Sequence, residues 1–248
     1  MSAPSILVNR DAEGLAHAFA ARFITLLVDV HSRGKVAQVV LTGGRVASRV
    51  YRAVAESPAR TAIDWQRVEF WWGDERFLPD GDPERNETQA RDALLSLVDV
   101  DPARVHAMPA DTGQGAEAAA AAYASELAAA VGPDDRNGVP TFDVLMLGVG
   151  PDGHVASLFP EYPQLQVDDR AAVAVHDSPK PPPTRVSLTF PALSRAQEVW
   201  FVVSGEDKAK AVGLALSGAD QIPAAVPKGL SRTLWLLDDA AAQELPHS

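Results

Sequence analysis

The sequence contains no cysteine in its 248 residues. This absence excludes a thiol nucleophile, a cysteine-ligated zinc site, an iron–sulfur cluster and a disulfide framework. Long apolar runs are also missing: none approaches the roughly 18 residues that cross a bilayer, and the first ten residues lack a basic segment followed by a hydrophobic one. We therefore expect a cytoplasmic protein that needs no metal or cofactor, does not span a membrane and is not secreted.

Basic residues are scarce relative to acidic ones. The chain has 22 Lys and Arg against 33 Asp and Glu, so its formal net charge is −11 and its pI is about 4.9. This sign repels a phosphate backbone, which argues against nucleic acid as a partner. If the ligand is itself an anion, basic groups must gather locally, so the positions of individual Arg and Lys residues are informative.

The hydrophobic pattern predicts strands that alternate with helices. Strands are expected at residues 5–8, 35–41, 67–72, 142–147, 171–175, 185–190, 198–203 and 233–237, and helices at 11–31, 46–55, 86–97, 115–131 and 207–216. Several strands are too uniformly apolar to face water on one side, which is typical of parallel sheets. We expect one α/β domain over residues 1–248, with a mostly parallel sheet and helices on both faces. The sequence predicts no oligomeric state, because apolar faces of covering helices and of a dimer interface look alike.

A glycine pair follows the predicted strand 35–41. Thr42, Gly43 and Gly44 stand between this strand and a predicted helix, where backbone N–H groups of the first helical turn can point at an anion. Phosphate is the ligand that this arrangement favours. The alternative is a tight turn that needs glycine only for its backbone dihedrals.

Three charged residues follow the predicted strand 67–72. Asp74, Glu75 and Arg76 come directly after Gly73. In open α/β sheets ligands bind beyond the carboxyl ends of the strands, so these residues are candidates for acid–base chemistry and anion binding. The alternative is a surface turn with a local Glu–Arg pair.

Residues 148–154 (GVGPDGH) follow the predicted strand 142–147. They match the dinucleotide fingerprint G-x-G-x-x-G formally. That fingerprint requires a helix after its third glycine, whereas Pro160 and Pro163 interrupt any helix here. We therefore do not expect a nicotinamide-dependent oxidoreductase.

The same loop places Asp152 two residues before His154. Histidine has the unperturbed pKa, about 6.5, that suits proton transfer near neutrality, and a nearby carboxylate can orient its ring. Of the six histidines, His154 is the candidate general base. A structural or solvated histidine is the alternative.

Two further basic residues follow. Arg185 begins the strand after a proline-rich loop, and Lys208 stands at the start of a predicted helix. A cation at a helix N-terminus opposes the helix dipole, so Lys208 there indicates a bound anion, and Arg185 can supply a bidentate fork. Taken singly, each could also be a solvated surface charge.

With these segments the sequence resembles the 6-phosphogluconolactonase family from its first strand to its last. The resemblance implies a Rossmann-like α/β fold and a metal-independent hydrolase that opens 6-phospho-D-glucono-1,5-lactone to 6-phosphogluconate in the oxidative pentose phosphate pathway. The landmarks are LTGG at 41–44, WGDERFLP at 72–79, FDVLMLGVGPDGHVASLFP at 142–160, SPKPPPTRVSLTFPAL at 178–193 and SGEDKAKAV at 204–212.

The resemblance also implies roles for individual residues. His154 would take a proton from the attacking water while Asp152 holds its ring. Many family members have a small hydroxyl residue after the glycine pair, where this chain has Arg45. The residues implied to bind the sugar phosphate are Thr42, Gly43, Gly44, Arg45, Asp74, Arg76, Arg185 and Lys208.

Two other functions stay open. The glucosamine-6-phosphate deaminase family looks similar over the same motifs, and Asp74 occupies the position of its proton-abstracting carboxylate. That family has an acidic residue five positions after the histidine, where this chain has Phe159, which cannot transfer a proton. A sugar-phosphate-binding protein without activity is the second alternative, although simple binding would not require Asp152 and His154.

Overall fold

The computed structural model describes residues 3–133, 135–136, 138–218 and 222–245. Its centre is a six-stranded sheet in the order β1-β9-β8-β5-β2-β3, in which every neighbouring pair runs parallel. This confirms the predicted parallel α/β architecture. The strands are β1 (Ser5–Asn9), β2 (Ala37–Leu41), β3 (Val68–Trp72), β5 (Phe142–Leu147), β8 (Ala196–Val203) and β9 (Arg232–Asp238).

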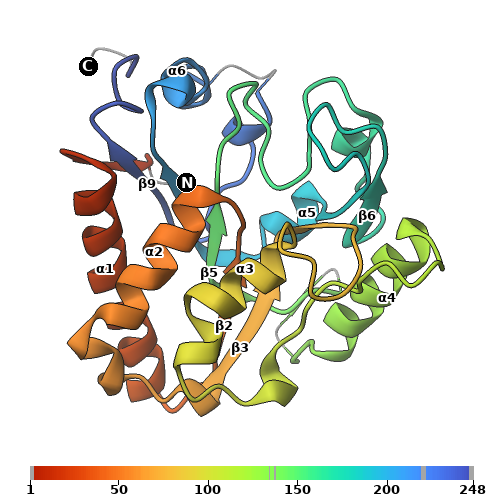
Figure 1. The fold of residues 1–248 in the computed structure, drawn as a ribbon, viewed down its shortest axis with the longest axis horizontal. Coiled ribbons are helices and arrows are strands. Elements are labelled where there is room, and N and C mark those ends of the chain that lie inside the picture. The colour runs from red at the N-terminus through yellow and green to blue at the C-terminus, as the bar shows by residue number, and fades with distance from the viewer. Residues whose placement is uncertain (1–2, 134, 137, 219–221, 246–248) are drawn as a thin grey trace.

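Helices cover the sheet, and its central strands are buried on both faces, as β2 and β5 show. Figure 1 shows α1 and α2 side by side, with α4 on the side of the molecule that carries β6. The predicted helix at 86–97 ends early, at Ala93, and a separate 3-10 turn follows at Leu95–Leu97. The helices are α1 (Ala12–Ser32), α2 (Arg45–Glu56), α3 (Asn86–Ala93), α4 (Ala116–Ala129), α5 (Phe190–Leu193) and α6 (Ala209–Leu216).

Helix α1 bears on the expectation that no apolar run approaches the length that crosses a bilayer. Among the helices of the described residues, it is long and apolar enough to cross a membrane by length and composition, with a mean hydropathy of 1.2. Charged residues such as Arg22 interrupt the run without lowering the average below that level. Its apolar side chains, including Phe19, Phe23 and Leu27, are fully buried in the core. Packing against the sheet and α2 therefore accounts for the hydropathy of this helix.

A second, antiparallel sheet adjoins the carboxyl edge of the first. It consists of β4 (Asp74–Arg76), β7 (Arg185–Leu188) and β6 (Ala172–Val175), in the order β4-β7-β6. Gly73 joins the two sheets, because its N–H donates to the Leu41 carbonyl at 3.0 Å and its carbonyl accepts from Leu188 N–H at 2.8 Å. The charged segment after β3 is therefore a short strand, which its composition did not predict.

The predicted strand at 185–190 is also shorter than expected. It ends at Leu188, and the short helix α5 begins at Phe190 with Pro191 in its first turn. Proline fits the first turn of a helix, where its missing N–H leaves no bond unmade. Proline thus sets the boundary between β7 and α5.

Two buried tyrosines bind the backbone where β2 and β3 end. The Tyr51 hydroxyl accepts a hydrogen bond from Thr42 N–H at 2.9 Å and donates to the Thr42 carbonyl at 2.8 Å. The Tyr123 hydroxyl does the same with Trp72, at 2.9 and 3.2 Å. Burial raises the pKa of both hydroxyls, so each keeps its proton. Each tyrosine satisfies a donor and an acceptor that the sheet leaves unpaired.

We predict that Tyr51→Phe lowers the free energy of unfolding by about 1–3 kcal/mol, because it leaves the buried N–H and carbonyl of Thr42 without this partner. Denaturant unfolding of both proteins measures the difference. Tyr162→Phe is the control, because the Tyr162 hydroxyl bonds to Asp177 in an exposed position and surface substitutions cost within about 0.5 kcal/mol. Equal stability of Tyr51→Phe and wild type would contradict the role given to this hydroxyl.

Candidate active site

The predicted site lies where the strand order reverses. The chain leaves β2 toward β3 on one side, and leaves β5 toward β8 on the other, so the loops that follow β2 and β5 diverge and open a crevice. A cleft of about 390 Å³ occupies this position. A larger hollow of about 1250 Å³ lies at the opposite edge of the sheet, and none of the predicted site residues lines it.

The cleft gathers almost all residues that the sequence singled out. Asp152 and Glu75 are the exceptions: Asp152 contacts His154 without itself lining the cleft, and Glu75 is buried behind its wall. The predicted residues that line it are Thr42, Gly43, Gly44, Arg45, Asp74, Arg76, His154, Arg185 and Lys208.

The glycine pair forms one wall of the cleft. Gly44 precedes α2 and has φ of 97°, a conformation that favours glycine. Gly43 leaves the space that the Asn86 side chain occupies, so a methyl group there would collide with the amide oxygen. Helix α2 begins with no side-chain cap and no acidic residue in its first turn. The turn therefore requires the glycine pair, and it also presents a helix start without a side-chain cap to the cleft; phosphate binding there stays a prediction.

Asp152 and His154 form a close pair at the end of β5. His154 Nδ1 lies 2.6 Å from Asp152 Oδ1, and the imidazole packs against Phe159 with ring centroids 4.5 Å apart. A side chain at Gly150 would collide with both members of the pair. Because Nδ1 is engaged with Asp152, Nε2 is the nitrogen left to act on a ligand.

The environment of Asp152 keeps it ionised. Partial burial acts to raise its pKa, but the hydrogen bond and charge of His154 and the charge of Lys180 outweigh that effect, and the pKa lies well below its ordinary value. Lys180 Nζ lies 3.7 Å from Asp152 Oδ1. An ionised Asp152 accepts a hydrogen bond from His154 Nδ1–H, so in the neutral ring Nε2 carries no proton and can act as the base.

Cationic side chains line the cleft in excess over carboxylates. Arg76 on β4 stands directly opposite Arg185 on β7, an arrangement of like charges that costs energy unless an anion lies nearby. Arg185 is buried, holds the carbonyls of Lys180, Pro181 and Pro182, and lies over the Phe159 ring. Burial is the main factor that lowers the pKa of Arg185.

Lys208 and Arg45 lie near each other at the start of α2. Lys208 Nζ is 2.9 Å from Asp207 Oδ2. The hydrogen bond from Lys208 is the largest factor that lowers the pKa of Asp207, and the charge of Arg45 adds to it. Arg45 is exposed at the rim of the cleft. Both cations therefore act on Asp207, and both line the cleft.

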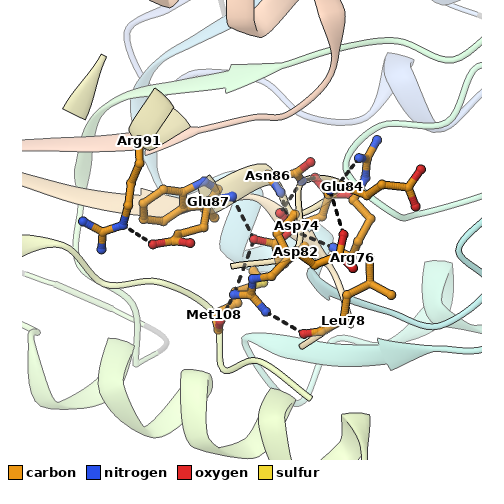
Figure 2. Close-up of polar contacts among 12 residues, drawn as sticks. Asp74, Arg76, Leu78, Asp82, Glu84, Asn86, Glu87, Arg91 and Met108 are labelled. Carbon is orange, nitrogen blue, oxygen red and sulfur yellow. Dashed lines mark hydrogen bonds and ion pairs between the residues drawn. The ribbon is translucent and has the colours of Figure 1, made fainter. Parts of the chain in front are cut away.

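Asp74 is bound by protein groups rather than solvent. It is 5% exposed, its Oδ2 accepts from Ser157 Oγ at 2.7 Å, and its carbonyl accepts from Asn86 Nδ2 at 2.8 Å. Figure 2 shows Asp74 and Asn86 next to Arg76, whose guanidinium donates to the Glu84 carbonyl at 2.5 Å.

Several residues of the site have no role predicted from the sequence. Lys180, Asp207 and Asn86 line the cleft, and Ser157 bonds to Asp74. Lys180 lies in the loop before β7, and Asn86 is the first residue of α3. Both are far from the glycine motifs in sequence. Only the proline-rich segment around Lys180, which cannot continue a helix, marked that region as a loop.

We predict that Asp152→Asn alters the acid dependence of stability. The folded-state pKa of Asp152 is below its ordinary value of 3.8, so its contribution is present above that value and is lost as the pH falls through the folded-state pKa. The difference in unfolding free energy between wild type and Asp152→Asn should therefore shrink as the pH falls below about 4. Denaturant titrations between pH 6 and pH 3 measure it. A difference that stays constant over this range would contradict the assignment.

Comparison with known proteins agrees with this geometry. The chain is 59% identical to the 6-phosphogluconolactonase of Streptomyces coelicolor over 250 residues, covering 99% of this chain and 96% of that protein. It is 46% identical to the 6-phosphogluconolactonase of Mycobacterium tuberculosis, with 98% of each chain covered.

Solved structures show the same fold. The 6-phosphogluconolactonase of Trypanosoma brucei has a TM-score of 0.87 at 25% identity, covering 98% of this chain and 99% of that one. A monomeric glucosamine-6-phosphate deaminase has a TM-score of 0.78 at 19% identity, covering 97% of this chain and 99% of that one, which shows a shared fold. The family described as glucosamine-6-phosphate isomerases/6-phosphogluconolactonase matches residues 10–235. The chain belongs to this family.

Proposed function

We propose that this protein is a 6-phosphogluconolactonase, which hydrolyses 6-phospho-D-glucono-1,5-lactone to 6-phosphogluconate with His154 as general base. The observation that carries the proposal is the Asp152–His154 pair at a cleft lined by cations. The 59% identity to the Streptomyces coelicolor enzyme over nearly the whole chain supports the substrate.

In this mechanism His154 activates water. Its Nε2 removes a proton as the water oxygen attacks the lactone carbonyl carbon, and Asp152 stabilises the imidazolium that forms. The tetrahedral intermediate then collapses, the bond from the carbonyl carbon to the ring oxygen breaks, and the imidazolium returns its proton to that oxygen. The products are a carboxylic acid, which loses its remaining proton to solvent and becomes the carboxylate, and a free hydroxyl on the same open chain.

The rest of the cleft binds the substrate's negative charge. The start of α2, which has no side-chain cap, offers the N–H groups of its first turn to the phosphate, while the Gly44 N–H donates to Gln89 Oε1 at 3.3 Å, and Lys208 and Arg45 line the same cleft. Arg76 and Arg185 lie opposite each other on β4 and β7 and supply further positive charge to the same cleft. Binding energy at the phosphate, remote from the reacting carbon, holds the lactone in register with His154.

The deaminase alternative lacks an acid where it needs one. Phe159 packs on the His154 ring and is 1% exposed, so an apolar ring fills the position of the acidic residue. The non-catalytic alternative predicts binding without turnover. A rate measurement separates these alternatives from the lactonase.

We predict that His154→Ala lowers kcat by about 10²- to 10⁴-fold, the usual contribution of a general base. The assay generates the lactone in situ and follows its disappearance against spontaneous hydrolysis. His17→Ala is the control, because His17 is exposed on α1 and should retain full activity. If folded His154→Ala matched wild type, the mechanism would be wrong. If wild type gave no acceleration, the lactonase would be excluded, and ammonia release from glucosamine 6-phosphate would then be assayed.

We predict that Lys208→Gln raises KM for the phosphorylated lactone about 10- to 100-fold, the loss expected for one charged hydrogen bond, with little change in kcat. Steady-state kinetics with 6-phosphogluconolactone and unphosphorylated glucono-1,5-lactone measure the effect, which should be confined to the phosphorylated substrate. Lys210→Gln is the matched control, because Lys210 is exposed two residues along. Equal losses on both substrates would refute phosphate binding by Lys208.

A further inference from the structure

A buried ion pair lies directly behind the wall of the cleft. Glu75 and Arg85 are each 1% exposed, and Arg85 Nη2 lies 3.6 Å from Glu75 Oε2. Neither residue lines the cleft, and the mechanism above assigns neither of them a step. A buried pair of this kind is weak evidence for stability, because removing two charges from water costs about as much as their attraction returns.

The Glu75 carboxylate binds the start of a helix. Its Oε1 accepts from Asn86 N–H at 2.6 Å and from Arg76 N–H at 2.8 Å, and its Oε2 accepts from Glu87 N–H at 2.9 Å. Asn86 and Glu87 are the first two residues of α3, whose N-cap residue makes no side-chain capping bond. A carboxylate from β4 therefore caps α3 from a distance, with the favourable sign for a helix N-terminus.

Arg85 completes this arrangement. Its guanidinium donates to the carbonyls of Leu78 and Met108, and Figure 2 shows these bonds beside the Asp74 and Asn86 contacts. Burial raises the pKa of Glu75 to about 7, while Arg85 and the three backbone N–H groups act in the opposite direction. Every one of these neighbours is a donor, so the carboxylate is the form that satisfies all of them.

Two of the three backbone N–H groups that Glu75 binds belong to residues of the cleft, Arg76 and Asn86. Arg76 carries one of the cleft's cations, and its backbone N–H is bound directly. Asn86 fills the space beside Gly43 and donates to Asp74. Asp74 in turn accepts from Ser157, three residues after His154. A single carboxylate thus joins the cation on β4, the phosphate loop and the segment that carries the base.

We infer that Glu75 is a positioning residue for lactone hydrolysis: it fixes β4 against the start of α3 and so sets the places of Arg76 and Asn86 in the cleft. This inference rests on the proposed function. It assigns the buried Glu75–Arg85 pair a role in positioning residues that bind the substrate, which a purely stabilising ion pair would not have.

The test is Glu75→Gln, which keeps the size of the side chain. The amide replaces one acceptor oxygen with a donor that faces N–H groups, so the start of α3 should shift. We expect KM for 6-phosphogluconolactone to rise at least tenfold, with a smaller change in kcat, because Arg76 and Asn86 line the substrate cleft while His154 keeps its Asp152 partner. Kinetics are measured well below the unfolding temperature of each variant.

Glu87→Gln is the matched control. It breaks the Glu87–Arg91 ion pair on the same helix, and neither residue lines the cleft. We expect lower thermal stability and a KM within twofold of wild type. An equal rise in KM for Glu87→Gln and Glu75→Gln would overturn the inference, because any weakening of α3 would then suffice.

A double variant tests whether the effect of Glu75→Gln arises only from leaving the buried Arg85 without its ionic partner. Glu75→Gln combined with Arg85→Met removes both buried charges, and it should fold and show the same rise in KM. Wild-type KM in a folded Glu75 variant overturns the inference, as does failure of both variants to fold, since Glu75 would then serve folding alone. An inactive wild type instead refutes the proposed function, which keeps the two failures distinct.

Discussion

The carboxyl edge of a parallel sheet leaves backbone N–H and carbonyl groups that no neighbouring strand pairs, and each one that stays buried and unpaired is costly. In this protein side chains from elsewhere supply the partners. Tyr51 binds the backbone of Thr42, and Tyr123 binds that of Trp72. Glu75 binds the start of α3. Helix α2 begins without such a cap and lines the cleft, which is why we place the proposed phosphate contact at its first turn.

Charge imposes a second condition on the same edge. The chain has a net charge of −11, so its overall field repels an anionic substrate. Arg76 and Arg185 nevertheless stand opposite each other on adjacent strands. Burial lowers the pKa of Lys180, and the nearby charge of Lys208 lowers it further. Cations gathered in this way repel one another until an anion enters. A substrate with a doubly charged phosphate relieves that repulsion and overcomes the unfavourable field at short range.

Sequence patterns predicted the features that depend on neighbours along the chain. The runs ending at Leu41, Trp72 and Leu147 gave the parallel strands, and the glycine motifs after them located the cleft, because strand ends in a parallel sheet meet at one edge. The antiparallel sheet was not predicted because β4 has three residues, all charged, and owes its conformation to pairing with the distant strand β7, where Asp74 lies opposite Ser187 and Arg76 opposite Arg185. Composition carries no signal for such a strand.

The residues Lys180, Glu75 and Arg85 also owe their positions to contacts between segments that are distant in sequence. Lys180 contacts Asp152 only because the loop before β7 folds back over the end of β5. For Glu75 the sequence left open both acid–base chemistry and a surface turn, and it assigned no role to Arg85, whereas the structure buries both side chains. Burial of a charged residue is a tertiary property, so periodicity and composition could not separate Glu75 from its neighbours Asp74 and Arg76.

The glycines of the motifs have a further consequence for how the family can vary its chemistry. Gly43 makes room for Asn86, and Gly150 makes room for the Asp152–His154 pair, so both segments of the cleft wall depend on glycine at these positions. Position 159 is constrained differently, because Phe159 is buried, packs on the His154 ring and lies under Arg185. An acidic residue there would bury a carboxyl group, which is costly unless a hydrogen-bond or ionic partner is supplied. A change of chemistry through position 159 therefore requires its neighbours to change as well, and a single substitution at this buried position does not suffice.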